Sequence, residues 1–234
     1  MWSIKEMKSR GMQAFRANYW QSVAVSFIMT IITAGSAGAA SSRGGAQPAD
    51  VTVDVASGTM TPRQTAIVAG LVVGALAIIG ITSTLLRILV GNPLEVGGRR
   101  FFKKNATNPA TPFACITEGF QNYGYVIITM LLRDVFIFLW ALLLIVPGVM
   151  KAYSYRMVPY LIKDNPELSP MEVLARSTEM MRGHRWQAFC MDLSFIGWLL
   201  LGVLTLNIGN IFWTNPYMNA TDAALYRELS GQQA

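Results

Sequence analysis

Charged side chains occur inside stretches of the sequence that are otherwise apolar. Carboxylates in such surroundings can act as general acids and bases, and arginines there can bind an anion. The alternative is mutual neutralisation, because an unpaired charge in an apolar environment is costly. We expect neutralisation to dominate, since the two signs nearly balance. The set comprises Arg87, Arg133, Asp134, Arg156, Asp192 and Asp222.

The apolar stretches around these charges are long enough to cross a membrane. Residues 125–146 carry only the adjacent pair Arg133-Asp134 as charge, and about 20 apolar residues in a helix cross the hydrocarbon of a bilayer. The 234-residue chain is 53% hydrophobic and only 14% charged, which is typical of a polytopic membrane protein. We therefore predict an all-α integral membrane protein.

Six transmembrane helices are expected, arranged as three hairpins. Lys and Arg flank the apolar stretches on one side, which places both termini in the cytoplasm and the protein in the plasma membrane. Residues 41–64 then form one outer loop. A cleaved signal peptide is the alternative to the first span, because Ala37-Gly38-Ala39 resembles a cleavage site. The predicted spans are residues 19–40, 66–90, 125–146, 148–163, 186–206 and 210–229.

Two amphipathic segments are predicted to lie on the cytoplasmic membrane surface. Residues 2–15 repeat apolar side chains at helical spacing, and Lys5, Lys8, Arg10 and Arg16 supply a basic face. The second segment begins with Ser169-Pro170-Met171-Glu172, which combines a capping box with proline at the first helical position. A stripe of small residues at every fourth position favours close helix packing in the first span; it comprises Ser22, Ser26, Thr30, Ala34 and Gly38.

A basic cluster follows the second span. Arg99, Arg100, Lys103 and Lys104 lie beside the membrane exit, and we interpret them as a lipid-facing basic patch. Gly97-Gly98 before the arginines could instead cradle a phosphate. That alternative is weaker, because no strand precedes the glycines and the Lys-Ser/Thr of a phosphate-binding loop is absent.

An internal repeat relates the beginning of the chain to its last third. A shift of 166 positions superposes Ser3 on Ser169, Arg16 on Arg182 and Trp20 on Trp186. We predict a single membrane domain, 1–234, with repeat-like units 1–104, 112–164 and 169–229, related by an axis along the membrane normal. Three unrelated hairpins are the alternative.

Several motifs resemble one known family. They are Trp2 with Lys5, Asn92-Pro93-Leu94-Glu95-Val96-Gly97, Arg100-Phe101-Phe102, Leu132-Arg133-Asp134, Pro147-Gly148 with Lys151, Tyr153, Ser154 and Tyr155, Asp192-Leu193-Ser194-Phe195-Ile196-Gly197-Trp198, and Asn215-Pro216-Tyr217. On these residues the chain resembles a bacterial multi-pass membrane family known as domain of unknown function family 975. The resemblance implies the membrane fold and supplies no catalytic residues.

Two functions are compatible with this sequence. The leading hypothesis is binding or transport of a small or amphiphilic anion through a cytoplasm-facing polar cavity lined by the six charged residues named first. The alternative is a non-transporting accessory or scaffold protein that binds anionic lipid or a partner complex.

Enzymatic activity is not expected, because the sequence carries no catalytic motif. We also expect no metal and no other cofactor, since the single histidine, His184, cannot form a metal cluster with two distant cysteines. The net charge of +6 resides beside apolar spans. Anionic membrane lipids are therefore the expected partners, and nucleic acid is not.

Overall fold

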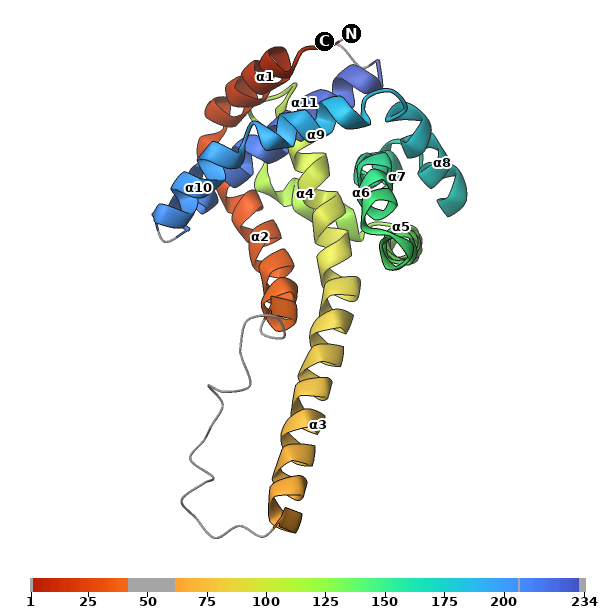
Figure 1. Ribbon diagram of the computed structural model, residues 1–234. Coiled ribbons are helices and arrows are strands. Elements are labelled where there is room, and N and C mark those ends of the chain that lie inside the picture. The colour runs from red at the N-terminus through yellow and green to blue at the C-terminus, as the bar shows by residue number, and fades with distance from the viewer. Residues whose placement is uncertain (1, 42–61, 206, 232–234) are drawn as a thin grey trace. The chain divides into compact units, whose positions relative to one another are not determined.

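The computed structural model describes residues 2–41, 62–205 and 207–231, which form helices and the turns between them (Figure 1). This confirms the predicted all-α class. The chain divides into two compact units: the first comprises Met1–Thr30 and Asn92–Ala234, and the second comprises Ile31–Gly91. Each unit is described by itself below.

The first unit contains most of the helices and the buried core. It begins with α1 (Ile4–Ala17) and the start of α2 (Tyr19–Ser41). It continues with α4 (Asn92–Asn105), the 3₁₀ helix η2 (Phe113–Phe120), α5 (Tyr123–Leu143), α6 (Ile145–Ser154), α7 (Val158–Asp164), α8 (Pro170–Met180), α9 (Arg185–Leu193), α10 (Ile196–Leu204), the π-helix η3 (Asn210–Thr214) and α11 (Asn215–Leu229). The second unit contains the rest of α2, α3 (Pro62–Leu86) and the π-helix η1 (Arg87–Gly91).

Three helical stretches are long and apolar enough to cross a membrane, counting only the residues that the structure describes. They are Val68–Asn105, Tyr123–Leu143 and Arg185–Leu204. A shorter apolar helix covers Tyr19–Ile31. The chain is therefore an all-α protein with candidate membrane-spanning helices.

The stretch Val68–Asn105 is much longer than a membrane requires. It has 38 residues, whereas about 20 helical residues cross the hydrocarbon layer. Its last third is the polar helix α4, which buries Val96, Phe101 and Phe102 in the core of the first unit. The apolar part of this stretch thus precedes α4, and α4 is a packed helix.

Two of the predicted spans are helical but interrupted. Residues 148–163 fall on α6 and α7, which are separated by a turn at residues 155–157. Residues 210–229 begin with the π-helix η3, immediately before Asn215-Pro216. The predicted outer loop, 41–64, lies mostly outside the described residues, although α3 already begins at Pro62.

The turn between α5 and α6 also differs from the prediction, which placed it at Pro147-Gly148. The chain turns at Leu144, whose backbone is extended. Pro147 lies in the first turn of α6, where a backbone N–H has no helical partner and proline is tolerated. Gly148 faces α5 at close range, because a Cβ added there would lie 2.6 Å from the Cα of Ala141.

The amphipathic segments form helices as predicted. In α1 the side chains of Met7 and Phe15 are buried, and α1 packs against α11. At the start of α8, the Ser169 hydroxyl accepts a hydrogen bond from the Glu172 N–H, and the Glu172 carboxylate accepts one from the Ser169 N–H. This is the predicted capping box.

The small-residue stripe of α2 faces α11 at Ser26 and Thr30. Ser22 and Ser26 are fully buried. Asn219 Nδ2 donates to Ser26 Oγ at 3.1 Å, and Asn215 Nδ2 donates to Thr30 Oγ1 at 3.0 Å. Short side chains on α2 thus allow close approach, and the hydroxyls of Ser26 and Thr30 accept hydrogen bonds from the facing helix, as is common between membrane helices.

Helices α4 and η2 pack backbone against backbone. A Cβ on Gly97 would lie 1.9 Å from the Ile116 carbonyl oxygen, and one on Gly119 would lie 1.9 Å from the Pro93 carbonyl oxygen. Such distances are far inside van der Waals contact, so these two positions require glycine. The two helices could not dock this closely with any other residue there.

The Gly97→Ala variant is expected to lower the thermal unfolding midpoint of the purified protein clearly. Overpacking typically costs about 1–3 kcal/mol, and the clashing atom is a backbone oxygen that cannot rotate away. Gly124→Ala is the matched control, because nothing lies within 4 Å of a Cβ added at Gly124 in α5. Equal midpoints for the two variants would contradict the proposed packing.

Candidate functional site

A network of ion pairs joins four helical segments of the first unit. Asp222 on α11 accepts hydrogen bonds from Arg99 Nη1 at 2.7 Å and from Arg156 Nη2 at 2.5 Å. Arg156 also binds Asp192 on α9 through both of its terminal nitrogens, at 2.6 and 2.8 Å. The Tyr153 hydroxyl donates to the same Asp192 carboxylate at 2.9 Å. We call Arg99, Tyr153, Arg156, Asp192 and Asp222 the Asp222 network.

The break between α6 and α7 places Arg156 in this network. Arg156 lies in the turn that follows α6, and its guanidinium lies 5.6 Å from the centre of the Tyr153 ring. On α4, the Arg99 guanidinium lies 5.8 Å from the Tyr160 ring. The side chain of Asp222 is only 9% exposed. The network therefore contains two cations and two anions, with the central carboxylate almost removed from solvent.

Arg133 and Asp134 lie in a different cluster. Arg133 Nη1 and Nη2 bind the two oxygens of Glu95 on α4, at 3.0 and 3.3 Å. Arg133 Nε also donates to Asp134 at 2.9 Å. Arg133 thus pairs both with its chain neighbour Asp134 and with Glu95 on another helix. The arginine fork has five donors, so a single side chain can bind both carboxylates.

The structure thus divides the six residues of the predicted cavity. Arg156, Asp192 and Asp222 are brought together, and Arg133 and Asp134 form their own cluster with Glu95. Arg87 belongs to the π-helix η1 in the second unit.

The predicted lipid-facing basic patch pairs with carboxylates of the same chain, which corrects that interpretation. Arg99 binds Asp222, and Lys103 binds Asp164 at 2.5 Å. Arg100 and Lys104 both bind Glu118 of η2. Residues four apart share one face of a helix. One stripe of α4 therefore faces α7 and α11, and the neighbouring stripe faces η2.

Glu95 and Tyr153 lie in the motifs shared with the family, but the sequence assigns neither them nor Glu118 and Asp164 as partners of the basic residues. The spacing of Arg99 with Lys103, and of Arg100 with Lys104, was the available signal, because it places two charged stripes side by side on one helix, where acidic side chains of packed neighbours can pair with them. Burial disfavours ionised Glu118, but hydrogen bonds from Lys104 and Arg100 outweigh it, so the pKa of that carboxyl lies below its ordinary value of 4.5.

A groove of about 800 Å³ runs along α1. Lys8 donates from Nζ to the backbone oxygen of Ser194 at 3.4 Å and to its hydroxyl at 3.2 Å. The Lys8 ammonium also lies 4.2 Å from the centre of the Phe195 ring, and partial burial lowers its pKa. The α1 groove is lined by Ile4, Lys5, Lys8, Ser9, Met12, Gln13, Arg16, Ser194 and Tyr217.

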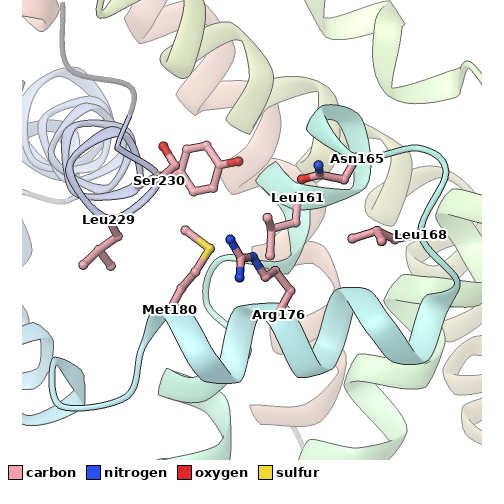
Figure 2. Close-up of a pocket in the computed structure, with 8 residues that line it drawn as sticks. Leu161, Asn165, Leu168, Arg176, Met180, Leu229 and Ser230 are labelled. Atoms are coloured by element: carbon pink, nitrogen blue, oxygen red, sulfur yellow. The ribbon is translucent and has the colours of Figure 1, made fainter.

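A smaller cavity of about 210 Å³ lies among α7, α8 and α11 (Figure 2). Arg176 and Met180 project from α8 toward Leu161. Arg176 already binds Glu179 at 3.1 Å, and both side chains are more than half exposed. Polar and apolar side chains both line this cavity, and its one cation has an acidic partner.

Metal ligands are not grouped in the described part of the chain: it holds no cluster of three or more His, Cys, Asp or Glu side chains suited to a metal ion.

Residues 120–233 match the model of a family described as "Protein of unknown function (DUF975)". This part of the chain belongs to the DUF975 family. The match covers α5 to α11, including Arg156, Asp192 and Asp222, whereas Arg99 lies outside it. No curated protein and no solved structure matches the chain.

The Asp222→Asn variant should be strongly destabilised, because Arg99 and Arg156 would lose the carboxylate between them. Breaking a buried ion pair by removing one partner costs about 3–5 kcal/mol. Thermal unfolding of the purified protein measures the effect. Glu179→Gln serves as the control, because its partner Arg176 is exposed and such pairs contribute little. A stable Asp222→Asn protein would show that the network does not hold the helices together.

Proposed function

We propose that this DUF975 protein is a non-enzymatic, multi-pass membrane protein of the accessory or scaffold kind, in which the buried charges assemble the helices. One observation carries the proposal. Each charge of the Asp222 network already has an opposite charge in the chain: Asp222 binds two arginines, and Arg156 binds two aspartates.

Anion transport is the second candidate function. It is favoured by the depth at which the sequence places the arginines, and it requires a guanidinium that is free to bind a solute. In the Asp222 network both terminal nitrogens of Arg156 donate to carboxylates. A solute anion would have to displace Asp192 or Asp222 to bind there. The assembly role needs no such rearrangement and is therefore the better-supported function.

A six-span arrangement with both termini in the cytoplasm is part of the proposal. It is supported by apolar side chains at the tips of two hairpins. Leu144 and Ile145, between α5 and α6, are 64% and 79% exposed, and Leu204, at the end of α10, is 80% exposed. Exposed apolar surface on this scale requires a covering medium. We place lipid around the flanking parts of α5, α6 and α10, with the turns themselves at the outer membrane surface.

Cysteine labelling tests the topology. In a background without Cys115 and Cys190, Leu144→Cys and Ile208→Cys are expected to react with an impermeant thiol reagent added outside intact cells. Both positions are exposed hairpin tips. Thr107→Cys, between α4 and η2, should react only after the cells are permeabilised. Labelling of Thr107→Cys from outside intact cells would contradict six spans. So would a result in which Ala46→Cys, in the predicted outer loop, is labelled from outside but Leu144→Cys and Ile208→Cys are not.

Flux measurements separate the two functions. We expect proteoliposomes with the parent protein to conduct chloride, phosphate and decanoate no faster than protein-free vesicles, because the network arginines are neutralised. The charge-neutral double variant R156Q/D192N should then change only the thermal stability. Transport would be established by three results together. The parent protein conducts an anion, the folded R156Q/D192N variant does not, and the Glu179→Gln variant still does.

A further inference from the structure

The α1 groove differs from the other basic surfaces in its charge balance. Lys5 and Arg16 are exposed, and neither has a carboxylate partner among the residues that the structure describes. Arg10, on the same helix but outside the groove, binds both Glu6 and Glu228. Lys5, Lys8 and Arg16 lie along one stripe, since their spacing follows the helical repeat. The α1 groove therefore carries positive charge that no carboxylate in the described part of the chain neutralises.

Lys8 is the fixed centre of this surface. Two contacts to Ser194, in the turn between α9 and α10, hold its ammonium group over the Phe195 ring. Ser9 and Gln13 add polar side chains along the groove, and Ile4, Met12 and Tyr217 add apolar surface. A volume of about 800 Å³ suits a small-molecule headgroup, since ligand sites typically measure about 300–1,000 Å³.

Aromatic side chains connect α1 to the membrane interface. Phe15 at the end of α1 contacts the rings of Tyr19 and Trp213, Tyr19 contacts Trp20, and Trp213 contacts Trp198. Trp20 is 74% exposed. Tryptophan and tyrosine concentrate at the level of the lipid headgroups. The cations of the α1 groove are thus on a helix that leads directly into an interfacial aromatic cluster.

We propose that the α1 groove binds the headgroup of an anionic phospholipid. Lys5, Lys8 and Arg16 face the phosphate, Ser9 and Gln13 hydrogen-bond to the polar headgroup, and Met12 and Tyr217 contact its apolar part. Clustered Lys and Arg on an amphipathic helix recognise anionic lipid in this way. An acidic protein segment would satisfy the charges equally well, but it would leave the adjoining aromatic cluster unexplained. The inference requires membrane placement and does not depend on whether the protein is a scaffold or a transporter.

The test compares lipid binding by the full-length protein in neutral detergent. Dioleoyl phosphatidylglycerol and dioleoyl phosphatidylcholine are titrated separately, and native mass spectrometry reports the bound fraction. The parent protein should prefer phosphatidylglycerol. The double variant K5Q/R16Q should bind it about 25-fold more weakly, since each cation at an anionic surface contributes about fivefold. Binding of phosphatidylcholine should not change.

A matched variant, R10Q/R176Q, controls for net charge. It also removes two exposed cations, but both have glutamate partners outside the α1 groove. It should keep the parent preference, and the conservative variant K5R/R16K should bind within about twofold of the parent protein. Should K5Q/R16Q fail to fold, Arg16→Gln alone is expected to lose about fivefold. The proposal would be overturned if K5Q/R16Q and R10Q/R176Q lost phosphatidylglycerol binding equally. It would also be overturned if the parent protein bound phosphatidylglycerol and phosphatidylcholine equally well. An acidic protein partner would then be the better occupant.

Discussion

The first unit depends on the neutralisation of Asp222. Its carboxylate is almost fully buried and lies between Arg99 of α4 and Arg156 of the α6–α7 turn. A charge in such a place is tolerated only with an opposite charge and good hydrogen bonds. Because Asp222 and its two partners come from three separate segments, neutralising this one group determines how α4, α11 and the α6–α7 turn approach each other. Asp192 then neutralises the remaining charge and attaches α9 to the same centre.

Interruptions of the helices are part of this arrangement. Arg156 lies in the turn between α6 and α7, Asp192 lies just before the turn between α9 and α10, and a π-helix precedes Asn215-Pro216 of α11. A continuous helix fixes the direction of every side chain, whereas a turn or π-helix can redirect one. Such irregularities are frequent at functional sites. Here the turn after α6 carries Arg156, the residue that binds both Asp192 and Asp222.

Two kinds of basic surface follow from the positions of the carboxylates. On α4, all four cations of the cluster at residues 99–104 bind acidic side chains of η2, α7 or α11, so their charge is used in holding the unit together. On α1, only Arg10 is engaged by glutamates, and Lys5 and Arg16 face outward. The first surface is structural. The second keeps a net positive charge beside the aromatic side chains that are typical of a membrane interface.

The sequence by itself determined the local features. Hydrophobic spacing predicts the helices, including the amphipathic α1, the Ser169 motif predicts the start of α8, and the apolar composition predicts a membrane protein, because each depends on residues close together in the chain. The spacing did not predict what covers α1: Met7 and Phe15, expected at the membrane surface, are buried in the protein, and α1 packs against α11. The need for charge neutralisation also follows from composition. Only the tertiary structure decided which charges pair. Arg99 and Asp222 are 123 positions apart, and many pairings of the same residues would balance the charge equally. Which one forms depends on the docking of α4 against η2 and on the turn after α6, and these are set by long-range packing that no local pattern encodes.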